Sequence, residues 1–258
     1  MIRNKIPVYF FEETALAELA GFVDRTTLYA FDLDGTLAPI VSEPQAIGIP
    51  DTVRTAFAEL TRRAPVAVIT GRSRADAMLH LGVEPRYLIG NHGVEGLPGW
   101  ALRERDFIRI AQGWQAQLAG LIEPDEYPGI EIENKGATLS LHYRRAASIS
   151  TALGAIRRAT GQLVPAPVRI RGKFVENLLP EGAPDKGAAL NVLMRHEGFE
   201  KAFFAGDDET DEQVFRLNSG NIFSVRVGKM KSSRAGFYLK GQYEVDRLLG
   251  ILNAIQNS

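Results

Sequence analysis

The sequence predicts an α/β fold, with a Rossmann-like parallel sheet as the main domain and a smaller α+β domain inserted into it. Three observations support this prediction. Strand-like apolar runs alternate with helix-like amphipathic runs in the first and last parts of the chain. The middle of the chain instead groups its strand-like runs as hairpins. Polar clusters follow several of the apolar runs, which is where open α/β sheets bind ligands.

The first part of the chain has the pattern of strands separated by helices. Short apolar runs end at glycine or polar residues, as buried parallel strands do. After Pro50, the residues Val53, Phe57 and Leu60 recur on one helical face. We therefore expect strands at Leu28–Leu33, Val66–Thr70 and Arg86–Gly90, with helices over Pro50–Arg63 and from about Ser73.

The middle block follows a different pattern, in which each helix precedes a hairpin. Alternating runs flank two turn-like dipeptides, Lys135-Gly136 and Gly172-Lys173. We expect helices over Glu104–Leu121 and Ser148–Ala159, and strands at Ile130–Asn134, Ala137–Arg144, Val168–Arg171 and Phe174–Leu178. This order is α+β, so we expect residues 98–180 to form an inserted domain between residues 1–97 and 181–258 of the main domain.

After Pro180 the alternation of the first part resumes. Apolar runs again stand between amphipathic ones, which favours further strands of the same parallel sheet. We expect helices over Asp185–His196, Glu209–Leu217 and Val245–Ile255, with strands at Ala202–Ala205 and Asn221–Val225.

The composition excludes several classes of protein. The 258 residues carry a net charge of -1, so there is no basic excess to bind nucleic acid. There is no cysteine, which excludes a disulfide framework and a thiolate nucleophile. The early apolar run is broken by Pro7 and closed by Glu12, and no segment has the length of a membrane span. We expect a soluble, cytoplasmic, monomeric protein.

The first cluster with chemical potential is the pair Asp32 and Asp34, which follows an apolar run and precedes Gly35. Side chains two positions apart in a strand point the same way, so we expect both carboxylates on one side of the strand end. Two adjacent like charges repel, and a cation is the simplest compensation. The alternative is an ordinary turn, in which Asp and Gly are common.

Three further clusters lie just past a strand or at a helix start. Thr70-Gly71-Arg72-Ser73 offers a hydroxyl and helix-start amides for an oxyanion, although Ser73 could simply cap the helix. Lys186 follows Asp185 at a helix start, where a cation is unfavourable unless something negative lies near; the alternative is a solvated surface lysine. The run Gly206–Glu212 holds more acids than capping needs and suits a hard cation such as Mg²⁺.

Together these clusters provide a carboxylate nucleophile, a hydroxyl, a cation and metal-binding acids. Phosphoryl transfer needs this combination, because an anion must attack a phosphate dianion and the charge must be neutralised. The clusters therefore predict a phosphoryl-transfer site at the carboxyl ends of the strands.

The four clusters resemble the motifs of the haloacid dehalogenase superfamily of phosphatases, in the same order and across nearly the whole chain. Further details look like the trehalose-6-phosphate phosphatase family within it. They are Gly90-Asn91-His92-Gly93, the run Glu133-Asn134-Lys135, Ser140, His142-Tyr143-Arg144, Gly172-Lys173, Glu176 and the full run Gly206–Glu212.

The resemblance implies a role for each core residue. Asp32 would be the nucleophile that forms an aspartyl-phosphate intermediate. Asp34 would protonate the leaving sugar oxygen and then deprotonate the attacking water. Mg²⁺ would be held by Asp32, the backbone carbonyl of Asp34 and Asp207, with Asp208 and Asp211 in support.

The resemblance also implies the substrate contacts. Thr70, Gly71 and Lys186 would bind the phosphoryl oxygens, and Arg72 and His92 would belong to the substrate site. The inserted domain would close over the substrate as a cap. Its sugar contacts would be Glu133, Lys135, Arg144, Lys173 and Glu176. Charged residues on hairpins are more often simply solvated, and a turn histidine such as His92 is often structural.

The implied activity is Mg²⁺-dependent hydrolysis of trehalose 6-phosphate to trehalose and phosphate. Alternatives within the superfamily are a phosphatase for sucrose phosphate or glucosylglycerol phosphate, or a sugar phosphomutase. A non-enzymatic alternative is a sugar-phosphate-binding regulator. Of the remaining candidates, we expect Trp100 and Trp114 to serve packing, and His80 and His196 to lie on helix surfaces.

Overall fold

The computed structural model describes residues 7–41, 48–172, 174–217 and 220–257. Its contacts divide the chain into two compact units. Unit 1 comprises Met1–Gly99 and Pro184–Ser258, and unit 2 comprises Trp100–Ala183. Unit 1 is built on a parallel sheet and unit 2 is α+β, which confirms the predicted fold class.

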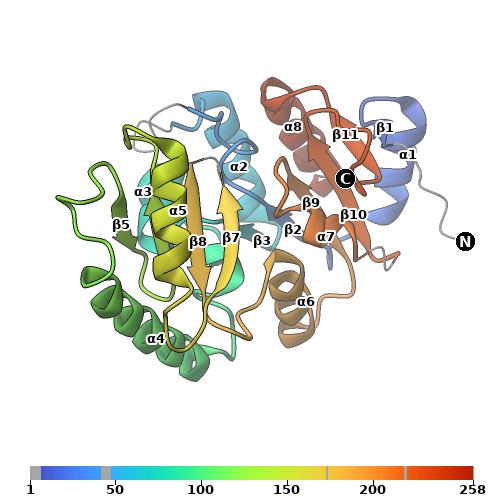
Figure 1. The fold of residues 1–258 in the computed structure, drawn as a ribbon. Coiled ribbons are helices and arrows are strands. Elements are labelled where there is room, and N and C mark those ends of the chain that lie inside the picture. The colour runs from blue at the N-terminus through green and yellow to red at the C-terminus, as the bar shows by residue number, and fades with distance from the viewer. Residues whose placement is uncertain (1–6, 42–47, 173, 218–219, 258) are drawn as a thin grey trace, which may run out of the picture. The chain divides into compact units, whose positions relative to one another are not determined.

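Within the described residues, unit 1 contains a seven-stranded parallel sheet in the order β1-β11-β10-β9-β2-β3-β4 (Figure 1). Its strands are β1 (Val8–Tyr9), β2 (Leu28–Phe31), β3 (Val66–Ile69), β4 (Tyr87–Ile89), β9 (Ala202–Gly206), β10 (Ile222–Val227) and β11 (Phe237–Leu239). The neighbouring strands β9, β2 and β3 are buried along their whole length. This burial explains their continuous apolar sequences.

The helices of unit 1 bury apolar stripes against this sheet. They are α1 (Glu13–Phe22), α2 (Asp51–Arg63), α3 (Arg74–Leu81), α6 (Lys186–Glu197), α7 (Glu212–Phe215) and α8 (Val245–Gln256), with 3-10 turns η2 (Asn91–Gly93) and η3 (Gln242–Glu244). Val53, Phe57 and Leu60 of α2 are buried, as their spacing predicted. Helices α2 and α8 pack together, and the Asn253 amide donates a 2.8 Å hydrogen bond to the Ala56 carbonyl.

Three elements of unit 1 were not predicted. Strands β1 and β11 have two and three residues, too few for an alternating pattern to be recognised. Helix α1 buries only Ala15 and Leu19, so its apolar stripe is narrow. Helix α7 is shorter than the predicted Glu209–Leu217, because the preceding acids form a turn of their own.

Unit 2 is a four-stranded antiparallel sheet in the order β5-β6-β8-β7, within the described residues. Its elements are α4 (Ala101–Ala119), β5 (Glu131–Asn134), β6 (Leu139–His142), α5 (Ile149–Thr160), β7 (Val168–Gly172) and β8 (Val175–Leu179). Side chains of both helices and of the inner strands form its core. Trp114 is buried there and its indole N–H donates a 2.6 Å hydrogen bond to the Pro165 carbonyl, so this residue serves packing as expected.

Among the described residues, no helix combines the length and the apolar character needed to cross a membrane.

Candidate active site

Three of the four predicted clusters follow neighbouring strands of the unit 1 sheet. Asp32 follows β2, Thr70 follows β3, and Asp207 follows β9, and β2 lies between the other two strands. All three strands are parallel, so their carboxyl ends share one edge. The sheet order therefore brings together groups that are far apart in the sequence.

Asp32 is buried at this edge, with 4% of its surface exposed. The Leu33 amide donates a 2.7 Å hydrogen bond to one carboxylate oxygen, and the Lys186 ammonium lies 3.0 Å from the other. Burial raises the pKa of Asp32 well above its ordinary value, although Lys186 opposes this shift. The Lys186 ammonium therefore compensates the charge of this buried carboxylate.

Lys186 is only 1% exposed, so the alternative of a solvated surface lysine is wrong. Its ammonium lies 3.0 Å from Asp32 and 2.9 Å from Asp211. Burial alone would lower the pKa of Lys186, but Asp211 and Asp32 raise it well above its ordinary value. The two carboxylates explain why a cation is tolerated at the start of α6, which Asp185 caps by accepting the Ala188 amide.

The acidic loop after β9 is fixed by its own carboxylates. One oxygen of Asp211 accepts the amides of Asp207 and Asp208, at 2.8 and 3.0 Å. Asp208 accepts the amide and the hydroxyl of Thr210. Gly206 is required here, because a Cβ atom would lie 2.2 Å from the Asp211 carboxyl carbon.

Asp32, Asp207 and Asp211 form a group whose carboxylate oxygens lie within 4.8 Å of one another. Asp208, which was expected beside the metal, is not in this group because its carboxylate is used inside the loop. Burial, followed by the charges of Asp211 and Asp208, raises the pKa of Asp207 to about 7. The site carries more negative than positive charge, and its oxygen donors fit a hard divalent cation.

Asp207 contributes to the pH dependence of the stability of the metal-free protein. Its folded pKa of about 7 exceeds the ordinary 3.8, so its stabilising contribution is complete at low pH and is lost as the pH rises through about 7. Affinity for a divalent cation should rise over the same range, because the metal displaces the proton. Urea unfolding in chelator, and metal titrations, between about pH 5 and about pH 8 measure both slopes. In Asp207→Asn both slopes should flatten; unchanged slopes would contradict this assignment.

The Asp34 carboxylate does not belong to the group formed by Asp32, Asp207 and Asp211. Strand β2 ends at Phe31, before the acidic pair, so the two-residue strand period does not apply to it. Arg72 instead donates two 2.7 Å hydrogen bonds, one to each Asp34 oxygen, and a third bond of 2.6 Å to Asp76. Arg72, which was expected to bind substrate, therefore fixes the Asp34 carboxylate through a bidentate interaction.

The turn after β3 packs tightly against His92, which was expected to belong to the substrate site. A Cβ atom at Gly71 would lie 2.6 Å from the imidazole ring, so only glycine fits. The His92 amide donates to the Thr70 carbonyl at 2.9 Å, and His92 has a left-handed backbone with φ of 61°. Thr70 is fully buried, and Ser73 caps α3 as the structural alternative predicted. The structure therefore packs Thr70 and Gly71, in the turn after β3, directly against His92 in the turn after β4.

Three of the predicted sugar-contact residues of unit 2 lie on or next to strands β5 and β6. Glu133 lies 2.8 Å from the His142 imidazole and 3.7 Å from the Lys135 ammonium. Arg144 follows β6, and its guanidinium lies over the Phe174 ring at 5.6 Å. These side chains combine hydrogen-bond donors and acceptors, as recognition of sugar hydroxyls requires.

Glu176 lies on the other face of the unit 2 sheet. Glu133 pairs with Ser140, whereas Glu176 pairs with Leu141, the next residue of β6. Because neighbouring strand residues point to opposite faces, Glu176 shares the face that packs on the helices. It is buried and accepts a 3.1 Å hydrogen bond from Arg171. Lys173, the fifth predicted contact, lies outside the described residues.

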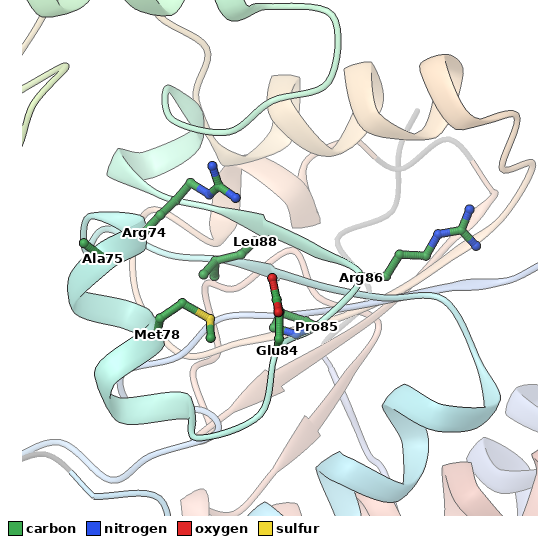
Figure 2. A pocket seen from close by; sticks show the side chains of 7 residues that line it. All are labelled: Arg74, Ala75, Met78, Glu84, Pro85, Arg86 and Leu88. Carbon is green, nitrogen blue, oxygen red and sulfur yellow. The ribbon is translucent and has the colours of Figure 1, made fainter.

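A separate surface pocket of about 270 Å³ lies beside α3 and β4 (Figure 2). Its lining residues are Arg74, Ala75, Met78, Glu84, Pro85, Arg86 and Leu88. None of the predicted site residues lines this pocket, so it is distinct from the acidic group.

One residue beside the acidic loop, Arg226 of β10, was missed by the sequence analysis. It forms a buried ion pair of 3.0 Å with Glu212, the last acid of the predicted run. A single arginine inside the apolar strand IFSVRV is the signal that could have identified it, because a charge in a buried strand needs a partner.

Residues 30–241 match the family model described as Trehalose-phosphatase. A relative named trehalose-phosphate phosphatase, from Mycobacterium avium (strain 104), is 33% identical over 204 residues, covering 76% of this chain and 52% of that protein. The chain thus spans about half the length of this curated relative.

Two solved structures share the fold. One is a trehalose-6-phosphate phosphatase related protein, with a TM-score of 0.70, 22% identity and coverage of 90% of this chain and all of the other. The second is a trehalose-6-phosphate phosphatase of Aspergillus fumigatus, with a TM-score of 0.61, 26% identity, and coverage of 97% of this chain and 99% of the other.

Proposed function

The chain belongs to the trehalose-phosphatase family, and we propose that it hydrolyses trehalose 6-phosphate to trehalose and phosphate. The observation that carries the proposal is the buried Lys186 between the carboxylates of Asp32 and Asp211, beside Asp207. This arrangement couples a carboxylate nucleophile to a cation and to a candidate metal site. The family match supports trehalose 6-phosphate as the substrate, because the relatives of this chain are named trehalose-phosphate phosphatases.

We assign Mg²⁺ to the acidic group, with Asp32, Asp207 and the backbone carbonyl of Asp34 as its ligands and Asp211 in support. Carboxylates with a substrate phosphate are the ligand type that Mg²⁺ prefers. When bound, the ion would neutralise charge on the transferring phosphoryl group.

In the proposed reaction the Asp32 carboxylate attacks phosphorus and forms an aspartyl phosphate. The ammonium of Lys186, the hydroxyl of Thr70 and the amide of Gly71 bind the phosphoryl oxygens and fix the line of attack. Lys186 is already held by Asp32 and Asp211, so it needs little reorganisation. Preorganised charge of this kind is the usual source of catalysis in phosphoryl transfer.

Asp34 would carry the proton in both half-reactions. It gives a proton to the leaving sugar oxygen and then takes one from the water that cleaves the aspartyl phosphate. Both of its oxygens accept hydrogen bonds from Arg72, the arrangement of an ionised carboxylate, so one of these bonds must open for Asp34 to carry the proton. We therefore assign Arg72 to positioning Asp34, with Asp76 holding the third guanidinium nitrogen.

Unit 2, the proposed cap, would supply the sugar contacts through Glu133, Lys135 and Arg144. Glu176 is better assigned to holding Arg171 on the helix-covered face. We expect Glu133→Gln to lower kcat/KM for trehalose 6-phosphate by roughly 10- to 100-fold, because the sugar hydroxyl exchanges a charged acceptor for a neutral amide. Activity on a small aryl phosphate, which has no sugar to bind, should be unchanged.

Glu131→Gln is the matched control for this prediction. Glu131 lies on the same strand and face, but it is paired with Arg145 at 2.9 Å. It should leave both activities unchanged. An equal loss with both substrates in Glu133→Gln would place Glu133 outside sugar recognition.

The proposed function is tested by phosphate release from a panel of sugar phosphates, with Mg²⁺ and with chelator. We expect the highest kcat/KM for trehalose 6-phosphate and no release in chelator. A preference for sucrose phosphate or glucosylglycerol phosphate would overturn the assignment of trehalose 6-phosphate as the substrate. A requirement for a bisphosphate would indicate a phosphomutase, and saturable binding without release would indicate a regulator.

A further inference from the structure

Arg226 is a buried arginine inside a strand of the unit 1 sheet. It belongs to β10, and its register partner on β9 is Gly206, the residue that precedes the acidic loop. Only 5% of its surface is exposed. A buried guanidinium is costly unless its donors are used, so its partners identify its role.

The two terminal nitrogens of Arg226 are directed at the acidic loop, whereas its Nε is buried without a hydrogen-bond partner among the described residues. One terminal nitrogen donates to the Asp208 carbonyl at 3.1 Å and to the Glu212 carboxylate at 3.0 Å. The other terminal nitrogen donates to the Asp207 carbonyl. Glu212 in turn accepts the Arg234 amide at 2.9 Å, which links the pair to the segment before β11.

The peptide groups around Asp207 are therefore held from both sides. Asp211 accepts the amides of Asp207 and Asp208, while Arg226 donates to the carbonyls of the same two residues. A peptide group fixed at its N–H and at its C=O cannot rotate. The backbone that carries the Asp207 side chain is thus held in place, and its carboxylate lies beside that of Asp32.

We propose that Arg226 is a positioning residue for the divalent cation: by clamping the carbonyls of Asp207 and Asp208 it presents the Asp207 carboxylate in its metal-binding orientation. The inference rests on the metal site of the proposed function. Groups that orient metal ligands typically change metal affinity by about 10- to 100-fold when removed. A purely structural ion pair would change stability and leave metal affinity unaltered.

The test is calorimetric titration of Mg²⁺ and Mn²⁺ into metal-free protein, with the folded fraction checked by urea unfolding. The main variant is Arg226→Met/Glu212→Gln, which removes the clamp without leaving a buried unpaired charge. We expect it to bind both ions roughly 10- to 100-fold more weakly than the wild type. The matched control is Glu212→Gln alone, which keeps the bonds of Arg226 to both carbonyls and should bind both ions within about twofold of the wild type.

Arg226→Lys provides a second test if the double variant does not fold. Lysine keeps the positive charge near Glu212 but lacks the planar fork that reaches two carbonyls, so its metal affinity should also fall. Wild-type affinity in a folded Arg226 variant, or an equal loss in Glu212→Gln, would overturn the inference while leaving the metal site intact. Failure of the wild type to bind either ion would overturn the metal site, and this inference with it.

Discussion

Asp32→Asn is expected to abolish phosphate release while leaving the fold intact. Asparagine has the same shape and can still accept the Leu33 amide, but its amide is not a nucleophile. The loss in kcat should be on the order of 10⁴ or more, as for removal of other covalent nucleophiles. Steady-state phosphate release with trehalose 6-phosphate measures the loss, and far-UV circular dichroism checks the fold.

The stability of this variant separates a catalytic role from a structural one. The substitution removes one charge from a buried group in which carboxylates outnumber the single lysine, so unfolding by urea should change by no more than about 1 kcal/mol. Asp51→Asn, at an 86% exposed side chain of α2, is the control for loss of a carboxylate. Normal turnover in folded Asp32→Asn would contradict the nucleophile assignment.

Lys186→Met is expected to have the largest effect on stability. It leaves Asp32 and Asp211 buried without the cation that contacts both. Breaking a buried ion pair in this way costs about 3–5 kcal/mol, because an uncompensated charge remains. Urea unfolding of the metal-free protein near neutral pH measures the loss, and turnover should be lost as well.

Two further readouts identify the cause of this loss. The deficit should shrink at low pH, because burial already raises the pKa of Asp32 and Asp211 and their protonation removes the unpaired charge. A divalent cation should restore part of the stability by binding the same carboxylates. Lys231→Met, at an exposed position, should change neither property. A deficit that is independent of pH would indicate lost packing of the lysine stem instead.

Local patterns were sufficient to predict the framework of the site. The strands Leu28–Phe31 and Val66–Ile69 are apolar along their length because both faces of the sheet are covered, and such runs are readily recognised. Turn residues at their ends then located Asp32 and Thr70. Proximity of these clusters followed from a parallel sheet, in which all strands end at one edge.

Side-chain partners were less predictable, because they depend on contacts between distant segments. The sequence of Arg72 and Asp34 does not reveal that the guanidinium holds both carboxylate oxygens. Lys186 looks like a surface lysine until α6 places it beside Asp32. The face occupied by Glu176 depends on strand register, where a shift of one residue exchanges the two faces.

Acid quenching of the reaction during the first turnover tests the central claim most directly. Protein with Mg²⁺ is mixed with trehalose 6-phosphate that carries a labelled phosphoryl group, quenched at successive times and digested. We predict label on the peptide that contains Asp32, rising before free phosphate and then declining, and no label in Asp32→Asn. Phosphate release with no labelled protein at any time, or label on a different peptide, would contradict the account.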